Sequence, residues 1–248
     1  MSVDPGNRFS AVAGLYAQYR PGYPASMADW IVSRARIRPP ARIADVGCGT
    51  GISSRLFAGR GFRVTGVDPN TEMLEQARAA GGAEYRQGTA DATGLEDAGT
   101  ALVTVAQAAH WFALEPAFRE FRRILEPSGA VVLFWNVRTS SPFMDGYDAA
   151  LKRFSTEYAI AHGDRIPDSA RLRTLPGVTS VETARFPNPT LLDWAGLQGR
   201  AFSASYVQHG VADKAGFERD LKALFEAHAA SGKAEFLHKT EVFLCRLS

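Results

Sequence analysis

The feature that most constrains the fold is a regular alternation of strand and helix patterns between residues 26 and 136. Short buried strands are expected at 41–46, 62–68, 83–88, 101–106 and 130–136. Amphipathic or capped helices are expected at 26–37, 51–60, 70–80 and 115–125. Such alternation specifies a parallel sheet with helices on both faces, because each strand reaches its parallel neighbour through a helical crossover. The fold class is therefore α/β.

The helix boundaries carry their own signals. Ser26 and Asp29 have the spacing of a capping box, and Asn70 is expected to cap the helix over 70–80. After residue 137 the alternation stops, and residues 141–175 and 190–230 have the pattern of helices and loops. Strand patterns return at 178–186 and 239–247, which makes seven strands. Because no repeat or flexible linker interrupts the chain, we expect one domain with a helical elaboration late in the sequence.

Composition excludes several classes of protein. The net charge of +2, from 28 basic and 26 acidic residues, is no electrostatic signature for nucleic acid or an anionic membrane. Cys48 and Cys245 form neither a disulfide framework nor a zinc-site spacing. The first ten residues lack the features of a signal peptide, and no apolar run approaches the roughly 20 residues of a membrane span. We therefore expect a soluble, cytoplasmic protein without a metal.

A glycine loop, Gly-Cys-Gly-Thr-Gly at 47–51, directly follows the first expected strand. Glycines there allow backbone amides to approach a ligand at the start of the next helix, although the loop could also be a tight turn that binds nothing. A dinucleotide fingerprint would place a third glycine at position 52, which is Ile52. A P-loop would need a lysine followed by Ser or Thr, which is absent. Both phosphate-binding interpretations are therefore disfavoured.

Two carboxylates follow the second and third expected strands. Asp68 lies 21 positions after Gly47 and could accept hydrogen bonds from both hydroxyls of a ribose. Its alternative role, capping the helix over 70–80, is already served by Asn70. Asp91 could accept a hydrogen bond from the amino group of adenine, although Asp is also common in turns. Since ligands of open α/β sheets bind at the carboxyl ends of strands, these positions together predict a nucleoside ligand.

Six segments carry a resemblance to a known family. They are "IADVGCGTG", "VTGVDPNTEML", "GTADATGL", "VAQAAHWF", "EFRRILEPSGAVVLFWN" and the N-terminal "YAQYRPGYP". On these segments the chain resembles the class I S-adenosylmethionine-dependent methyltransferases, and within them the small-molecule subgroup that includes the trans-aconitate methyltransferases. The resemblance is specific over 41–137 and looser elsewhere. Ser128 replaces the usual glycine before the fifth strand, and 88–100 is poor in apolar residues.

The resemblance implies a fold and a cofactor. The fold is a Rossmann-like seven-stranded sheet in the order 3-2-1-4-5-7-6, with the last strand antiparallel. It would form a single domain over 1–248, with a core of 1–140, 176–189 and 232–248 and a helical cap at about 141–175 and 190–231. The cofactor is S-adenosylmethionine, and S-adenosylhomocysteine is the product. The candidate cofactor-binding residues are Tyr16, Arg20, Asp45, Gly47, Cys48, Gly49, Asp68, Pro69, Asn70, Met73, Ala90, Asp91, Ala92 and Gln107.

The expected reaction moves a methyl group to a small organic acceptor, at an oxygen of a carboxylate or hydroxyl, by in-line displacement. The cofactor's sulfonium is a good leaving group, so the protein needs mainly to align the reacting atoms and exclude water. His110, after the fourth strand, is the candidate general base, or else it shapes the pocket wall with Trp111. Arg20, or a tyrosine among Tyr16, Tyr19 and Tyr23, could approach the methionine carboxylate; alternatively the aromatic residues of this segment only pack around the turn at 20–24. Further candidates to line the acceptor pocket are Trp194, Ser203, Ser205, Tyr206 and His209.

Three alternatives stay open from sequence. An RNA or protein methyltransferase with the same core would need a basic face or an added module, and Arg119, Arg122 and Arg123 are more typical of a solvated helix face. A nicotinamide-dependent oxidoreductase is disfavoured by Ile52. The third is a nucleotide-binding protein without catalysis. We expect a small-molecule acceptor and neither nucleic acid nor membrane as partner, and the sequence does not indicate an oligomeric state.

Overall fold

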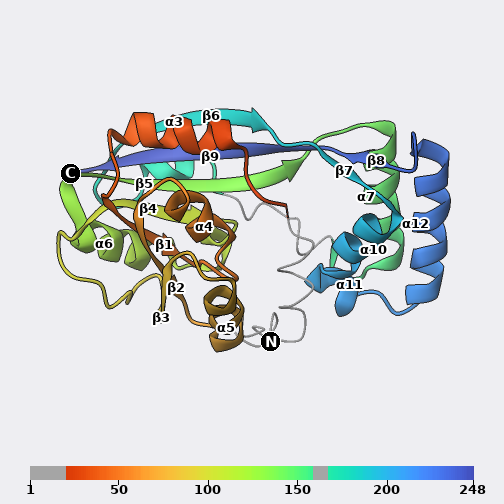
Figure 1. Cartoon of the computed structure of the whole chain (residues 1–248), viewed down its shortest axis with the longest axis horizontal. Coiled ribbons are helices and arrows are strands. Elements are labelled where there is room, and N and C mark those ends of the chain that lie inside the picture. The colour runs from red at the N-terminus through yellow and green to blue at the C-terminus, as the bar shows by residue number, and fades with distance from the viewer. Residues whose placement is uncertain (1–20, 159–166) are drawn as a thin grey trace.

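The computed structural model describes residues 21–158 and 167–248, which form a seven-stranded sheet flanked by helices (Figure 1). Tyr16 and Arg20 lie outside the described residues. The strand order is β3-β2-β1-β4-β5-β9-β6. The strands are β1 (Arg42–Val46), β2 (Arg63–Asp68), β3 (Glu84–Gln87), β4 (Thr100–Ala106), β5 (Leu125–Arg138), β6 (Val178–Pro187) and β9 (His238–Leu247). Strands β1 to β5 pair in parallel, whereas β9 is antiparallel to both β5 and β6, which confirms the predicted order with β9 as the seventh strand.

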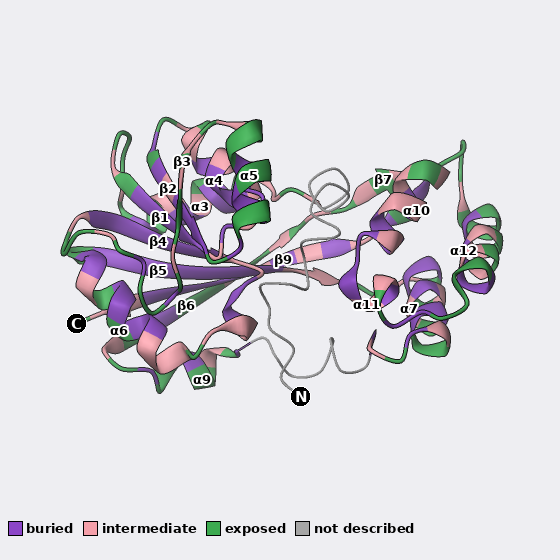
Figure 2. Ribbon diagram, turned by 90° about the horizontal axis from the view of Figure 1, so that it is seen from below, coloured by how far each residue is buried: buried purple, intermediate pink, exposed green. Residues whose placement is uncertain are grey.

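Helices cover both faces of this sheet (Figure 2). One side carries α3 (Ala25–Ala35), α4 (Ile52–Ala58) and α5 (Thr71–Ala80), and the other carries α6 (Leu114–Ile124) and α9 (Ser169–Arg173). Alternate residues of β5 belong to two different apolar clusters: Val132 and Phe134 pack with α3 and α4, and Leu133 and Trp135 pack with α6 and α9. Burial on both faces explains why this strand reads as a continuous apolar run.

One local expectation differs from the structure and another is confirmed. The capping box of Ser26 and Asp29 is wrong, because α3 begins at Ala25 and its first turn closes through the Met27 N–H on the Pro24 carbonyl at 3.1 Å. Asp29 instead forms an ion pair with Arg60 at 3.1 Å. Asn70 does cap α5, since its side chain accepts from the Met73 N–H at 2.9 Å.

Beyond the ends of β5 and β9, a second group of elements surrounds its own apolar cluster (Figure 1). It contains α7 (Pro142–Phe154), α10 (Trp194–Phe202), α11 (Ser205–Gln208), α12 (Lys214–His228) and the two-stranded pair β7 (Thr190–Leu192) and β8 (Ala234–Phe236). The pair β7–β8 was not expected. Helix α9, expected in the cap range, packs instead on the sheet through Leu172. The division into core and cap within one domain stays a prediction. No helix among residues 21–158 and 167–248 is long and apolar enough to cross a bilayer.

Candidate functional site

The carboxyl ends of β1 and β2 bring the glycine loop and Asp68 together. The Gly47 N–H donates to the Val67 carbonyl at 2.8 Å, and the Gly49 N–H donates to Asp68 Oδ2 at 2.8 Å. Asp68 Oδ1 accepts from the Asn70 N–H at 2.9 Å. Burial raises the pKa of Asp68, while these two N–H donors oppose that shift. Each carboxylate oxygen has a further lone pair, so Asp68 can still accept hydrogen bonds from a ligand.

The surroundings of two loop glycines differ. Gly49 and Gly51 have φ angles of 53° and 76°, in the left-handed region that favours glycine. A Cβ on Gly51 would overlap the hydroxyl of Tyr85, so packing inside the protein excludes a side chain there. A Cβ on Gly49 would meet no heavy atom of the described residues within 4 Å. Among residues 21–158 and 167–248, the loop therefore leaves space at Gly49, beside the Asp68 carboxylate, where a ligand can approach the backbone.

Asp45 lies beneath this loop rather than on its surface. Its side chain is fully buried and accepts hydrogen bonds from Ser54 Oγ at 2.6 Å and from Thr104 Oγ1 at 3.0 Å. Burial raises the pKa of Asp45 to about 6. The carboxylate thus joins β1 to α4 and β4, and a direct contact of Asp45 with a cofactor stays a prediction. The sequence did not predict that Ser54 and Thr104 bind Asp45. The one signal that each residue gives is a hydroxyl within a segment expected to be buried.

Cys48 is a small packing residue of the same loop. Its side chain is 7% exposed, and its Sγ lies 3.7 Å from the Gly49 carbonyl. Burial raises the pKa of the Cys48 thiol, and the negative charges of Asp45 and Asp68 raise it further. A thiol held protonated is a poor nucleophile.

The residues after Asp68 border the same edge of the sheet. Asn70 and Met73 are buried, and the Gln87 side chain donates to the Pro69 carbonyl at 3.1 Å. In the loop after β3, Ala90 is buried, whereas Asp91 and Ala92 are exposed. The Thr89 N–H donates to the Ala92 carbonyl at 3.2 Å, so Asp91 lies in a tight turn. The structure therefore brings the second and third predicted segments to the edge that carries the glycine loop.

The loop after β4 adds His110 at this edge. Gln107 has a φ of 59°, uncommon for a residue other than glycine, and its N–H donates to the Phe134 carbonyl at 3.0 Å. The chain then turns into the short 3₁₀ helix η2 (Ala109–Trp111). The rings of His110 and Trp111 lie 4.9 Å apart, and both residues are half-buried. This arrangement suits a pocket wall and a base equally, so both roles of His110 stay predictions.

The predicted pocket residues of the cap have different surroundings. Trp194 packs against Phe225 on α12, Ser203 is buried with its hydroxyl on the Arg200 carbonyl at 2.8 Å, and His209 is exposed. Ser205 is buried at the start of α11. Tyr206 packs with its ring 5.2 Å from that of Tyr158.

Tyr158 contacts Arg138, a residue that was not among the site residues predicted from sequence. Arg138 ends β5, and its guanidinium carbon lies 5.5 Å from the ring centre of Tyr147 and 5.2 Å from that of Tyr158. It donates to the Tyr158 hydroxyl at 2.7 Å, and that hydroxyl donates to Asp148. Arg138 is thus an arginine held between aromatic rings at the end of the strand next to β4. Its one sequence signal is a charge directly after an apolar run.

A sheet of this order, with a glycine loop bonded to the acidic end of β2, defines an α/β domain whose ligand site is expected at the carboxyl ends of the strands. Residues 44–133 match the family model described as a methyltransferase domain. An uncharacterised methyltransferase-like protein of Schizosaccharomyces pombe is 36% identical over 142 residues, 56% of either chain. A malonyl-acyl-carrier-protein O-methyltransferase of Enterobacter lignolyticus is 33% identical over 129 residues, 49% of this chain and 51% of its own. These matches span about half the length of the curated relatives.

A solved structure extends the likeness in fold. A protein of Anaeromyxobacter dehalogenans, provisionally named a type II methyltransferase, superposes with a TM-score of 0.68 at 22% identity, covering 92% of this chain and 97% of its own. Residues 44–133 thus match a methyltransferase domain, and the solved structure shows the same fold over most of the chain. The subgroup named from sequence stays a prediction. The site fits the S-adenosylmethionine expected from the sequence, because no described heavy atom lies within 4 Å of a Cβ on Gly49 and Asp68 retains acceptor capacity for a ribose.

Proposed function

We propose that this protein is an S-adenosylmethionine-dependent methyltransferase that methylates an oxygen of a small organic acceptor. The observation that carries the proposal is the Gly49 N–H bonded to Asp68 at 2.8 Å, at the carboxyl edge of the parallel strands. The same edge carries the turn of Asp91 and the loop of His110. The name of the Enterobacter lignolyticus relative supports oxygen as the accepting atom.

The chain's own residues bind and orient the cofactor. Asp68 accepts hydrogen bonds from the ribose hydroxyls, and Asp91 accepts one from the adenine amino group. The space at Gly49 lets the ligand lie against the backbone of the loop. Gln107 borders the cofactor from the end of β4. When bound, S-adenosylmethionine supplies a methyl group on a sulfonium leaving group. The protein then has to hold the acceptor in line with that methyl and exclude water, which can lower the barrier by several kcal/mol.

Arg138 is the residue that best fits an acceptor carboxylate. A guanidinium presents paired donors that match a carboxylate, and the flanking rings of Tyr147 and Tyr158 limit its freedom. Burial raises the pKa of Tyr158, so its hydroxyl stays neutral. An acceptor carboxylate is already ionised at neutral pH and needs no base. With such an acceptor His110 shapes the pocket, and with a hydroxyl acceptor it serves as the general base.

The test is transfer of a labelled methyl group from S-adenosylmethionine to a panel of small carboxylic acids, phenols, amines and RNA. We expect label on acids, in a product that alkali hydrolyses as an ester does. Arg138→Gln should raise the KM for the best acid about 10- to 100-fold, the loss of a charge-assisted bond. Arg153→Gln is the matched control, since it removes an exposed arginine of α7 that pairs with Asp220. Label confined to RNA, phenols or amines, or equal KM values for the two variants, would contradict the carboxylate assignment.

A further inference from the structure

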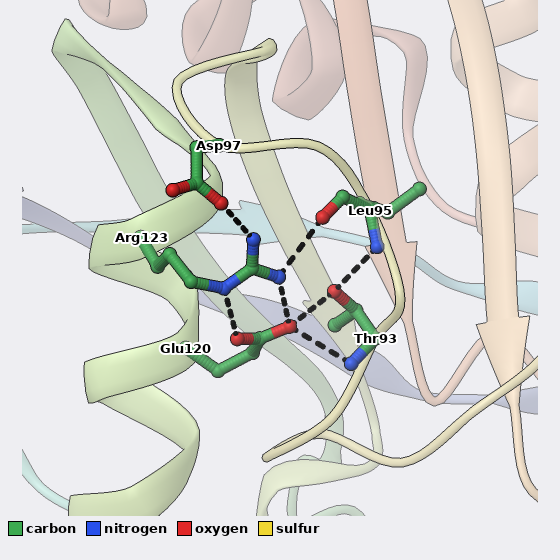
Figure 3. A network of polar contacts seen from close by, with 5 residues as sticks. All are labelled: Thr93, Leu95, Asp97, Glu120 and Arg123. Carbon is green, nitrogen blue, oxygen red and sulfur yellow. Dashed lines mark hydrogen bonds and ion pairs between the residues drawn. The ribbon is translucent and has the colours of Figure 1, made fainter.

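Two charged residues of α6 bind the loop that follows β3 (Figure 3). Glu120 Oε1 accepts from the Thr93 N–H at 2.9 Å and from Thr93 Oγ1 at 2.5 Å. Arg123, one helical turn later, donates to Glu120 at 2.7 Å and to the Leu95 carbonyl at 2.9 Å, and it also forms an ion pair with Asp97. Figure 3 shows these side chains converging on the loop from one side of the helix.

The contact is buried and charge-assisted. Thr93 has no exposed surface, and Glu120 is 9% exposed. The hydrogen bonds from Arg123, together with those from Thr93, lower the pKa of Glu120 to about 2 despite its burial. Glu120 is therefore ionised throughout the physiological pH range. Hydrogen bonds to a charged acceptor are about twice as strong as neutral ones, so this contact attaches the loop firmly to α6.

The attached loop is the one that carries Asp91. The loop leaves the sheet beside the ribose-binding carboxylate, since the Gly88 N–H donates to the Asp68 carbonyl at 3.2 Å. Asp91 lies two residues before Thr93, within about 7 Å of chain. The turn with Asp91 is thus held at one end by β2 and at the other by Glu120. No regular strand or helix holds it in between among the described residues.

Helix α6 is a rigid support for this contact. Phe118 and Phe121 are fully buried against the sheet, so the helix cannot shift without opening the core. Its own start follows the loop of His110 directly. Glu120 and Arg123 therefore attach the Asp91 turn to the helix that begins directly after the loop of His110.

We propose that Glu120 and Arg123 are positioning residues that set the preference of the cofactor site for adenine. They act through the Asp91 turn and touch no ligand themselves. The inference rests on the proposed function, because it assumes that Asp91 accepts the adenine amino group. It adds that the preference depends on a buried carboxylate in α6, 27 residues away from Thr93 in the sequence.

The experiment compares two ligands that differ only at the base. Calorimetry gives the Kd of S-adenosylhomocysteine and of S-inosylhomocysteine, in which oxygen replaces the adenine amino group. We expect the unmodified protein to prefer the adenine ligand about tenfold, the value of one good hydrogen bond. Glu120→Gln should lose most of that preference, while its Kd for the inosine ligand changes less than about twofold.

The matched control is Glu115→Gln on the same helix. Glu115 pairs with Arg171 of α9 at 2.5 Å, and within the described residues that pair does not involve the loop. Glu115→Gln should keep the full adenine preference. Thr93→Val, which keeps the shape and removes the hydroxyl donor, replaces Glu120→Gln if that variant does not fold in a thermal melt.

The two possible failures are distinguishable. If the unmodified protein binds neither ligand, the proposed function is wrong and the inference with it. If it binds S-adenosylhomocysteine but Glu120→Gln or Thr93→Val keeps the adenine preference of the Glu115→Gln control, the inference alone is overturned.

Discussion

A methyl group added at Gly49 tests whether a ligand or the fold requires glycine at this position. The Gly49→Ala substitution places a Cβ where the described residues leave 4 Å of open space, beside the Asp68 carboxylate. We propose that the cofactor occupies that space. The substitution should therefore damage binding far more than stability.

The expected loss of stability is small. Alanine in the left-handed region costs about 1–2 kcal/mol, and no packing term is added because no described atom is displaced. For a chain of this length about 1 kcal/mol lowers Tm by about 2–4 °C. Binding is affected differently, because a buried methyl at a close backbone contact forces the ligand away from the loop. We expect the Kd of S-adenosylhomocysteine to rise at least about 100-fold, or about 2.7 kcal/mol.

The matched control is Gly232→Ala. Gly232 has a φ of 74° and likewise has no described heavy atom within 4 Å of an added Cβ, but it lies in the turn between α12 and β8. The two variants should show similar melting temperatures, measured by differential scanning calorimetry. Isothermal titration should show wild-type affinity for Gly232→Ala only. Wild-type affinity in Gly49→Ala would refute the placement of the cofactor against the loop.

Three further predictions concern polar residues of the site. Asp68→Asn, which keeps the shape and removes the charge, should weaken binding of S-adenosylhomocysteine about 10- to 100-fold by calorimetry; unchanged binding would exclude a ribose contact. His110→Ala should keep the initial rate with a carboxylic acid acceptor within about tenfold, whereas a loss of about 10²–10⁴-fold would indicate a general base. Asp45→Asn should remove a pH-dependent contribution to stability. Because burial raises the pKa of Asp45 from 3.8 to about 6, the protonated form is favoured on folding. The contribution is therefore fully present below about pH 4, is lost as pH rises through 6, and is on the order of 3 kcal/mol. Chemical denaturation gives the free energy of unfolding of the unmodified protein and of Asp45→Asn from pH 4 to 8. The same dependence on pH in both proteins would contradict the prediction.

The sheet could be predicted because its signal is local. Each strand that is buried on both faces forms an apolar run, as in Val131 to Trp135, and each helix of the crossover has one apolar stripe. The order of the strands then followed from the family resemblance. The three-residue strands β7 and β8 are too short to carry a period, so they were missed.

The candidate site was predictable only in part, for a reason that is also physical. Gly49 and Asp68 signal their role through residue type and position at strand ends. The burial of Asp45 depends on Ser54 and Thr104, which are 9 and 59 residues away. The setting of Arg138 depends likewise on tyrosines brought from α7 and the segment after it. Contacts between distant side chains leave no pattern in the sequence.

The proposed function requires that the loop at 47–51 binds S-adenosylmethionine rather than a dinucleotide. Isothermal titration of the full chain with S-adenosylhomocysteine and, separately, with NAD tests it most directly. We expect saturable binding of S-adenosylhomocysteine and no measurable heat with NAD. Tight binding of NAD without a response to S-adenosylhomocysteine would contradict it.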